Sequence, residues 1–179
     1  MDSMSSRYAL AMFDIAVEKD KLPFVLECAK TFRKLVLSNK ELISYFSSRF
    51  VTQDEHEKFI DETFKGFDVE FLSLIKIVIK NHRSNYLLDI IDCFISMGNE
   101  KLNILEGKII STIKLDESKI SEIEEVLSNK LKQKVELKND IDESILGGVK
   151  VTINDRVFDG SVKSRLTSLK NNLKERRAS

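Results

Sequence analysis

The sequence predicts an α+β protein, with an N-terminal six-helix bundle followed by a small C-terminal α/β domain that has a short sheet and two helices. Aromatic residues come first, because ten of the eleven Phe and all three Tyr precede residue 95. Glycines come later, since four of the six Gly follow Glu106. Apolar residues repeat at helical steps up to that residue and alternate as in strands beyond it. We therefore expect two domains, residues 1–106 and 107–179.

The composition limits the classes of function. Of the 179 residues, 42% are hydrophobic and 32% charged, which is typical of a soluble globular protein. Lys plus Arg and Asp plus Glu both number 29, so no global charge attracts nucleic acid or anionic lipid. Two isolated cysteines favour a reducing compartment. The longest apolar segment, Phe71 to Ile79, is far shorter than the roughly 20 residues of a membrane span, and no signal peptide is recognisable.

The first predicted helix, around Tyr8 to Val17, is unusually apolar. Nine of these ten residues are apolar, and at about 100° per residue they cover an arc of roughly 260°. A helix that packs on a single core needs an apolar stripe of only about 100°. A second apolar surface must therefore cover this helix, and it belongs either to another helix of the same fold or to a partner protein.

Three further helices follow. Pro23 fits the first turn of the second helix, whose apolar residues recur at three- and four-residue steps: Leu22, Val25, Leu26, Ala29, Phe32 and Val36. Ser38 with Glu41, and Thr52 with Glu55, are spaced as capping boxes and predict the next two helix starts. The third helix is short, and the fourth carries one apolar side, made by Phe59, Ile60, Phe64 and Phe67.

The fifth helix, from about Asp68 to His82, is the second one with surplus apolar surface. Its apolar residues span an arc of roughly 220°. Ser84 is then expected to cap a long sixth helix with five inward residues, Leu87, Ile91, Phe94, Leu102 and Leu105.

After residue 106 the pattern becomes that of a small α/β unit. The segment from Lys108 to Leu115 alternates and predicts a strand with Ile109, Ile113 and Leu115 on one side. Asp116 is expected to cap a helix with a stripe of Ile120, Ile123, Leu127 and Leu131.

Three more strands and a final helix complete this unit. Val135 and Leu137 indicate a second strand, and Gly147-Gly148 precede a third that turns at Asn154-Asp155 into a short fourth. Ser161 then caps a last helix that bears Val162, Leu166, Leu169 and Leu173.

A search for chemistry finds no catalytic group, cofactor site or metal site. His56 has no second histidine three or four residues away, so we expect a packed side chain, and His82 is expected at a helix end. The glycine pairs match no nucleotide-binding loop. The basic end, with Lys170, Lys174, Arg176 and Arg177, complements a helix dipole or, alternatively, makes the chain a nucleic-acid-binding adaptor.

Three stretches together resemble one known family. They are Arg7-Tyr8-Ala9 with Ala11-Met12-Phe13 and Ala16; Leu74-Ile75 with Asn81-His82-Arg83 and Leu87 to Ile91; and Asp142 to Val149 with Val151 to Asp155 and Val157 to Val162. In this order and spacing the chain resembles the delta subunit of the rotary ATP synthase, whose mitochondrial counterpart is the oligomycin-sensitivity-conferring protein.

The resemblance implies a non-catalytic stator subunit. In that family a six-helix N-terminal domain holds N-terminal helices of alpha subunits, and the C-terminal domain joins the C-terminal end of the b-subunit stalk. We therefore expect these two partners, no nucleic acid, no small-molecule ligand and no cofactor. The expected location is peripheral, on the cytoplasmic face of a bacterial cell membrane, although a mature organellar form would look the same.

The resemblance also implies contact residues. The family's head-binding groove corresponds to the first and fifth helices, so it implies contacts with the alpha subunit from Tyr8, Ala9, Met12, Phe13, Ala16, Ile75, Val78 and Ile79. For each of them the alternative is a place in the internal core. His82 stands where the family often has glycine before the arginine, which puts a contact at that corner in question.

Overall fold

The computed structural model describes residues 3–39, 41–48 and 50–167. The chain divides into two compact units, Met1–Leu102 and Asn103–Ser179, which are described separately. Gly107, the residue used to place the predicted boundary, lies inside the first strand of the second unit.

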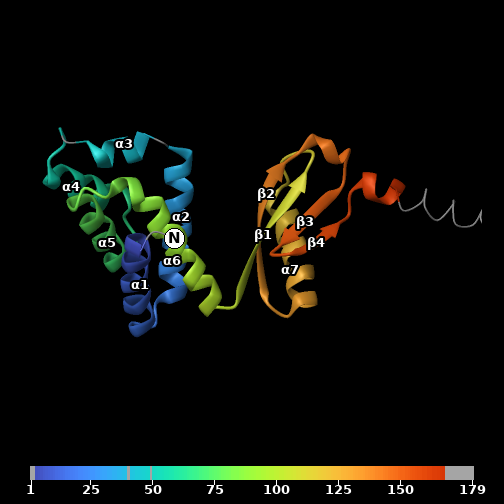
Figure 1. The fold of residues 1–179 in the computed structure, drawn as a ribbon, viewed down its shortest axis with the longest axis horizontal. Helices are drawn as coiled ribbons and strands as arrows, with labels where there is room; N and C mark the ends of the chain where they lie inside the picture. The colour runs from blue at the N-terminus through green and yellow to red at the C-terminus, as the bar shows by residue number, and fades with distance from the viewer. Residues whose placement is uncertain (1–2, 40, 49, 168–179) are drawn as a thin grey trace, which may run out of the picture. The chain divides into compact units, whose positions relative to one another are not determined.

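The N-terminal unit consists of helices (Figure 1). They are α1 (Ser3–Glu18), α2 (Leu22–Ser38), α3 (Glu41–Ser47), α4 (Gln53–Thr63), α5 (Val69–Lys80), the 3-10 turn η1 (Ser84–Tyr86) and α6 (Leu87–Lys101). Its core contains an aromatic cluster, in which the ring of Phe32 lies 5.0 Å from that of Phe64 and 5.8 Å from that of Phe71 between centroids. The α+β class is confirmed. The six-helix bundle stays a prediction in its detail, because α3 has only seven residues.

Local signals located several helix starts. Thr52 Oγ1 accepts a hydrogen bond from the Glu55 amide while Glu55 Oε2 accepts one from the Thr52 amide, which confirms that capping box. Pro23 lies in the first turn of α2, as predicted. The capping box at Ser38 was wrong, since Ser38 is the last residue of α2 and its Oγ donates to the carbonyl of Lys34.

The end of the N-terminal unit also differs from the prediction. Ser84 does not cap α6, because its buried Oγ donates to the carbonyl of Phe46 at 2.7 Å. The predicted sixth helix was too long, since α6 ends at Lys101. Asn103 follows with φ +57°, a left-handed conformation that ends a helix, so Leu105 lies in a strand.

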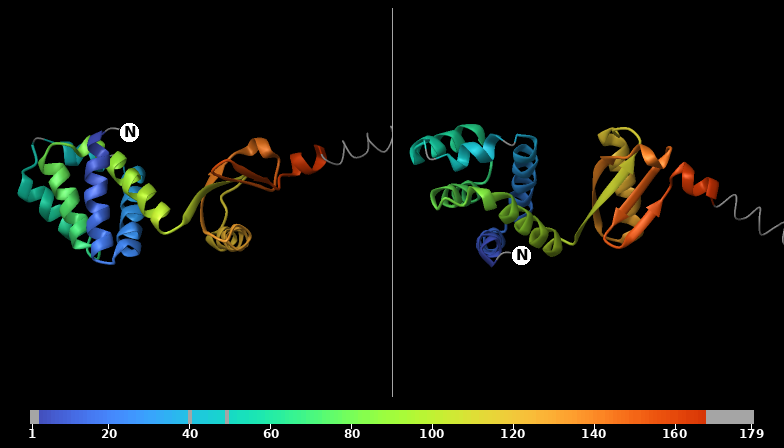
Figure 2. Two further views of the ribbon diagram at one scale, coloured as in Figure 1. Left: turned by 60° about the horizontal axis from the view of Figure 1, so that its bottom comes forward. Right: turned by 45° about the horizontal axis from the view of Figure 1, so that its top comes forward.

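The C-terminal unit is a four-stranded sheet with a crossover helix. Its elements are β1 (Ile104–Ser111), α7 (Glu117–Leu131), β2 (Lys134–Ile141), the 3-10 turn η2 (Glu143–Ile145), β3 (Val149–Ile153) and β4 (Arg156–Asp159). The strand order is β2-β1-β3-β4; β1 and β2 are parallel and the other pairs antiparallel. Parallel neighbours need a crossover, and α7 provides it while packing on one face of the sheet (Figure 2). The core between them is Ile109, Leu127, Val135, Leu137, Val151 and Ile153.

Most predicted elements of this unit are present, with shifted ends. β1 starts at Ile104 rather than Lys108, and Ile113, predicted to face inward, lies beyond the strand and is 68% exposed. Asp116 is at the N-cap of α7 but its side chain makes no capping hydrogen bond. The turn at Asn154-Asp155 and the cap by Ser161, whose Oγ accepts from the Ser164 amide, are confirmed.

The predicted last helix is described only as far as residue 167. The other residues assigned to it lie outside the described ranges: Leu169, Lys170, Leu173, Lys174, Arg176 and Arg177.

Candidate partner-binding site

Helices α1 and α5 lie side by side and are tied together at both ends (Figure 2). At one end Lys19, just after α1, pairs with Glu70 in the first turn of α5. At the other end the Tyr8 hydroxyl accepts a hydrogen bond from Arg83 Nη1 at 2.6 Å and another from Asn81 Nδ2 at 3.1 Å. The start of α1 is therefore next to the end of α5, so the two helices are antiparallel.

This ion pair and these hydrogen bonds show which side of each helix faces the other helix. Helical periodicity places Ala11 and Ile15 on the flank of α1 that carries Tyr8 and Lys19. It likewise places three residues on one flank of α5 with Glu70, namely Leu74, Ile77 and Asn81 at its end. Between the two tied ends, the residues on these flanks are apolar.

We name this strip the α1/α5 surface and define it by Tyr8, Ala11, Ile15, Leu74 and Ile77. Ile15 is 39% exposed and Ile77 is 49% exposed, while Ala11 is exposed and the other two are half-buried. Exposed apolar side chains thus lie on two adjoining helices, and an exposed apolar surface of this kind is what an amphipathic helix covers.

Most residues predicted from the sequence as contacts lie in the core of the chain itself. Six of the eight are at most 4% exposed: Ala9, Met12, Ala16, Ile75, Val78 and Ile79. A side chain this buried offers no accessible surface to a partner, so the internal-core alternative describes these six in the structure.

The remaining two predicted contacts do not share one surface. Tyr8 and Phe13 are five positions apart on α1, which turns their side chains by roughly 140°. Phe13 lies on the flank that also carries Ser6, whose hydroxyl is 4.0 Å from Cys93 Sγ of α6. The residues predicted as contacts do not include the outward residues of the two helices, Ala11, Ile15, Leu74 and Ile77.

The acidic end of α5 is held by a small charge cluster. The hydrogen bond from the Lys19 ammonium lowers the pKa of Glu70 to about 2, and the pKa of Lys19 is raised by the same partner. Lys21 Nζ lies 3.4 Å from Asp68 Oδ2, and that carboxylate also accepts from the Glu70 and Phe71 amides as the cap of α5. This end of the helix pair is therefore joined by ionised groups at neutral pH.

The opposite end contains a pocket beside Arg83. The Arg83 guanidinium lies 5.5 Å from the centroid of the Tyr8 ring, within reach of a cation–π interaction. A pocket of about 340 Å³ is lined by Met4, Arg7, Tyr8, Ala11 and Arg83. We name it the Arg83 pocket.

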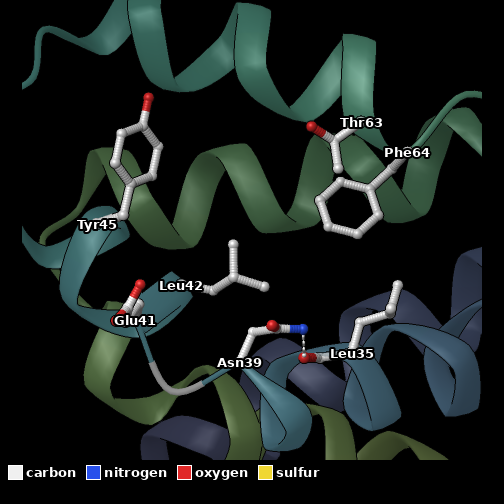
Figure 3. A pocket seen from close by; sticks show the side chains of 7 residues that line it. All are labelled: Leu35, Asn39, Glu41, Leu42, Tyr45, Thr63 and Phe64. Carbon is white, nitrogen blue, oxygen red and sulfur yellow. Dashed lines mark hydrogen bonds between the residues drawn. The ribbon is translucent and has the colours of Figure 1, made fainter.

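The N-terminal unit has two other pockets. One of about 400 Å³ opens between α2, α3 and the end of α4, where the side chains of Leu42 and Phe64 point into it (Figure 3). Glu41 is the one carboxylate among the described residues that line it. Another, of about 530 Å³, is lined by His56 and His82 among other residues. His56 is buried and its Nε2 lies 3.0 Å from the Tyr45 carbonyl, which confirms the prediction that it packs. Across the described residues, His, Cys, Asp and Glu form no cluster suited to a metal ion.

None of the helices in the described part of the chain combines the length and apolar character that a membrane span requires.

Residues 4–173 match the family model of the ATP synthase delta (OSCP) subunit. The chain belongs to this family. It is 32% identical to ATP synthase subunit delta of Mycoplasma mobile over 94% of each chain, and 34% identical to that of Metamycoplasma arthritidis over 91% of each. The subunit of Caldanaerobacter subterraneus subsp. tengcongensis is 32% identical over 96% of this chain and 97% of its own.

The fold is also found in a solved complex. A chain of the Toxoplasma gondii mitochondrial ATP synthase hexamer superposes with a TM-score of 0.69, covering 96% of this chain and 98% of that chain at 19% identity. At this identity the likeness concerns the fold alone.

Family membership decides the class of function. A delta/OSCP subunit is a non-catalytic stator component of the ATP synthase peripheral stalk, so the predicted family and function are confirmed. These matches give no support to the alternative of a nucleic-acid-binding adaptor.

Proposed function

We propose that the N-terminal unit holds the N-terminal helix of an alpha subunit on the α1/α5 surface, while the C-terminal unit binds the C-terminal end of the b-subunit stalk. The observation that carries this proposal is the exposed apolar strip between two tied helix ends. A stator joint must resist rotor torque without chemistry, and burial of apolar surface at about 25 cal/mol per Å² supplies a durable contact of that kind.

The ties at both ends favour this role. The Lys19–Glu70 pair and the Tyr8–Arg83 hydrogen bond fix the spacing of α1 and α5 before any partner arrives. A docking surface that is already formed costs less conformational entropy on binding. The six buried residues first predicted as contacts then support the surface indirectly, because they pack in the core beneath the two helices.

The C-terminal unit offers a different apolar patch for the stalk. Val162 N donates to the Gly147 carbonyl at 3.0 Å, which brings the start of the last helix against the turn before β3. Three large apolar side chains near this contact are exposed: Leu146 at 71%, Val162 at 43% and Leu166 at 57%. We assign this patch to the b-subunit end.

The cellular placement follows from the same assignment. The relatives named above are bacterial subunits, which supports a peripheral position on the cytoplasmic face of the cell membrane. The stalk then carries the membrane attachment.

The test is calorimetric titration of the full chain with a synthetic peptide of the alpha-subunit N-terminal helix. Ile15→Asp should weaken binding by at least about tenfold, because a charge on the strip must be desolvated under the docked helix. Leu10→Asp is the matched control, since Leu10 is 47% exposed on another side of α1, away from Ile15. If the unmodified chain does not bind the peptide, or if both variants bind equally, the proposal fails.

A further inference from the structure

The two ends of the α1/α5 surface differ in charge. Close to the Lys19 end, four carboxylates accompany two ammonium groups: Glu18, Asp20, Asp68 and Glu70 with Lys19 and Lys21. Among the described residues, the charged side chains at the Arg83 end include the cations Arg7, Lys80 and Arg83. A helix that covers the apolar strip therefore meets opposite charges at its two ends.

Arg83 is placed to bind an anion from such a helix. Its side chain is half-buried, and among the described residues it forms no ion pair with a carboxylate. Within the described part of the chain, its guanidinium contacts the Tyr8 hydroxyl and the face of the Tyr8 ring. A guanidinium has five N–H donors and stays charged, so donors remain after the single bond to Tyr8.

Docking of a helix desolvates the Arg83 guanidinium, which costs free energy unless the partner brings a hydrogen-bond acceptor. A helix on the α1/α5 surface removes water from the Arg83 pocket, and the lost hydration of a guanidinium is recovered only by a new charge-assisted hydrogen bond. A carboxylate fits the planar fork of the guanidinium in a bidentate manner. Met4 and Ala11 in the pocket wall accept an apolar neighbour of that carboxylate.

We propose that Arg83, held by Tyr8, binds a carboxylate of the docked alpha-subunit helix and thereby fixes the direction in which that helix lies. The acidic part of the helix lies at the Arg83 end, and its basic part lies toward Glu18 and Glu70. This inference rests on the proposed function and adds the recognition chemistry of the same site. Such a pair contributes direction and specificity, because the reversed helix places like charges together at both ends.

The experiment titrates the full chain with the alpha-subunit N-terminal peptide and with versions in which each acidic residue is replaced by its amide. Arg83→Gln should weaken binding by about tenfold, and Arg83→Lys should lose less because the charge remains. Lys34→Gln, at an exposed position of α2 outside the α1/α5 surface, is the control and should change affinity by no more than about twofold.

The amide substitutions in the peptide identify the carboxylate that binds Arg83. One amide substitution should weaken binding as much as Arg83→Gln, and the two changes together should cost little more than either alone, as a double-mutant cycle requires for an interacting pair. Arg83→Gln that binds within about twofold of the unmodified chain, with unchanged circular dichroism and melting temperature, overturns the inference but leaves the proposed function in place.

A folding defect does not remove the test. If Arg83→Gln unfolds, the amide peptides are titrated against the unmodified chain, and a set in which none binds more weakly overturns the inference. If the unmodified peptide itself does not bind, the proposed function fails and this inference fails with it.

Discussion

The two units differ in how they cover their apolar residues. In the C-terminal unit the strands alternate, so that Ile109, Val151 and Ile153 face α7 while the other face carries ion pairs such as Lys108–Asp140 and Lys138–Glu106. In the N-terminal unit α1 is apolar around most of its circumference, and its own core covers only one part of it. The apolar surface of α1 that this core leaves uncovered is the surface that we propose as a docking site.

Substitutions on the buried and exposed sides of α1 should differ most in their effect on stability. Met12→Asp puts a carboxylate into a core position that is 2% exposed, so we expect it to destabilise the N-terminal unit by at least about 3 kcal/mol or to unfold it. Leu10→Asp, on an exposed side of the same helix, should change stability by only about 0.5 kcal/mol. Urea unfolding followed by circular dichroism measures both, and equal effects would contradict the burial described for α1.

One glycine with positive φ in each unit allows the cost of adding a Cβ to be compared. Gly148 of the C-terminal unit has φ +80°, and a Cβ there would lie 2.6 Å from the Gly160 carbonyl oxygen. Gly148→Ala should therefore cost at least about 2 kcal/mol. Gly66 of the N-terminal unit has φ +95° but no atom within 4 Å of an added Cβ, so Gly66→Ala should cost about 1 kcal/mol. Denaturant unfolding of the two variants checks this order, and the reverse order would refute the close approach at Gly148.

The charge cluster at the start of α5 gives a smaller effect that depends on pH. The pKa of Glu70 is lowered in the folded chain from 4.5 to about 2, so its contribution to stability is present above pH 4.5 and is lost as the pH falls toward 2. Glu70→Gln should remove this part of the acid sensitivity of the melting temperature. Glu62→Gln, at an exposed position of α4, is the control and should keep it. A Glu70→Gln curve parallel to that of the unmodified chain between pH 5 and 2 would rule out the Lys19–Glu70 tie.

Features of the fold that depend on neighbouring residues were easier to predict than features that depend on residues far along the chain. Thr52 and Glu55 form a capping box that is complete within four residues, so the sequence located it. The same spacing at Ser38 failed, because α2 continues through that residue. The start of β1 had no local signal. Gly107 lies inside the strand, and a Cβ there would meet Leu137 and Ile153, which are far along the chain.

The sequence indicated which helices carry surplus apolar surface but not which of their faces are exposed. The apolar arc of α1 exceeded one core, yet which part of the arc faces inward depends on its packing against α5 and α6, so Met12 and Ile15 could not be told apart. His82 adopts φ +55°, a conformation that glycine reaches most easily, and Arg83 still reaches Tyr8 beyond it.

Chemical-shift mapping of the isotope-labelled chain with the alpha-subunit N-terminal peptide tests the central claim most directly. The largest changes should fall on the α1/α5 surface, at Tyr8, Ile15 and Ile77, with smaller ones at Leu10 on another side of α1. Changes confined to the side of α1 that carries Leu10, or to the C-terminal unit, would contradict the assignment of this surface as the docking site for the alpha subunit.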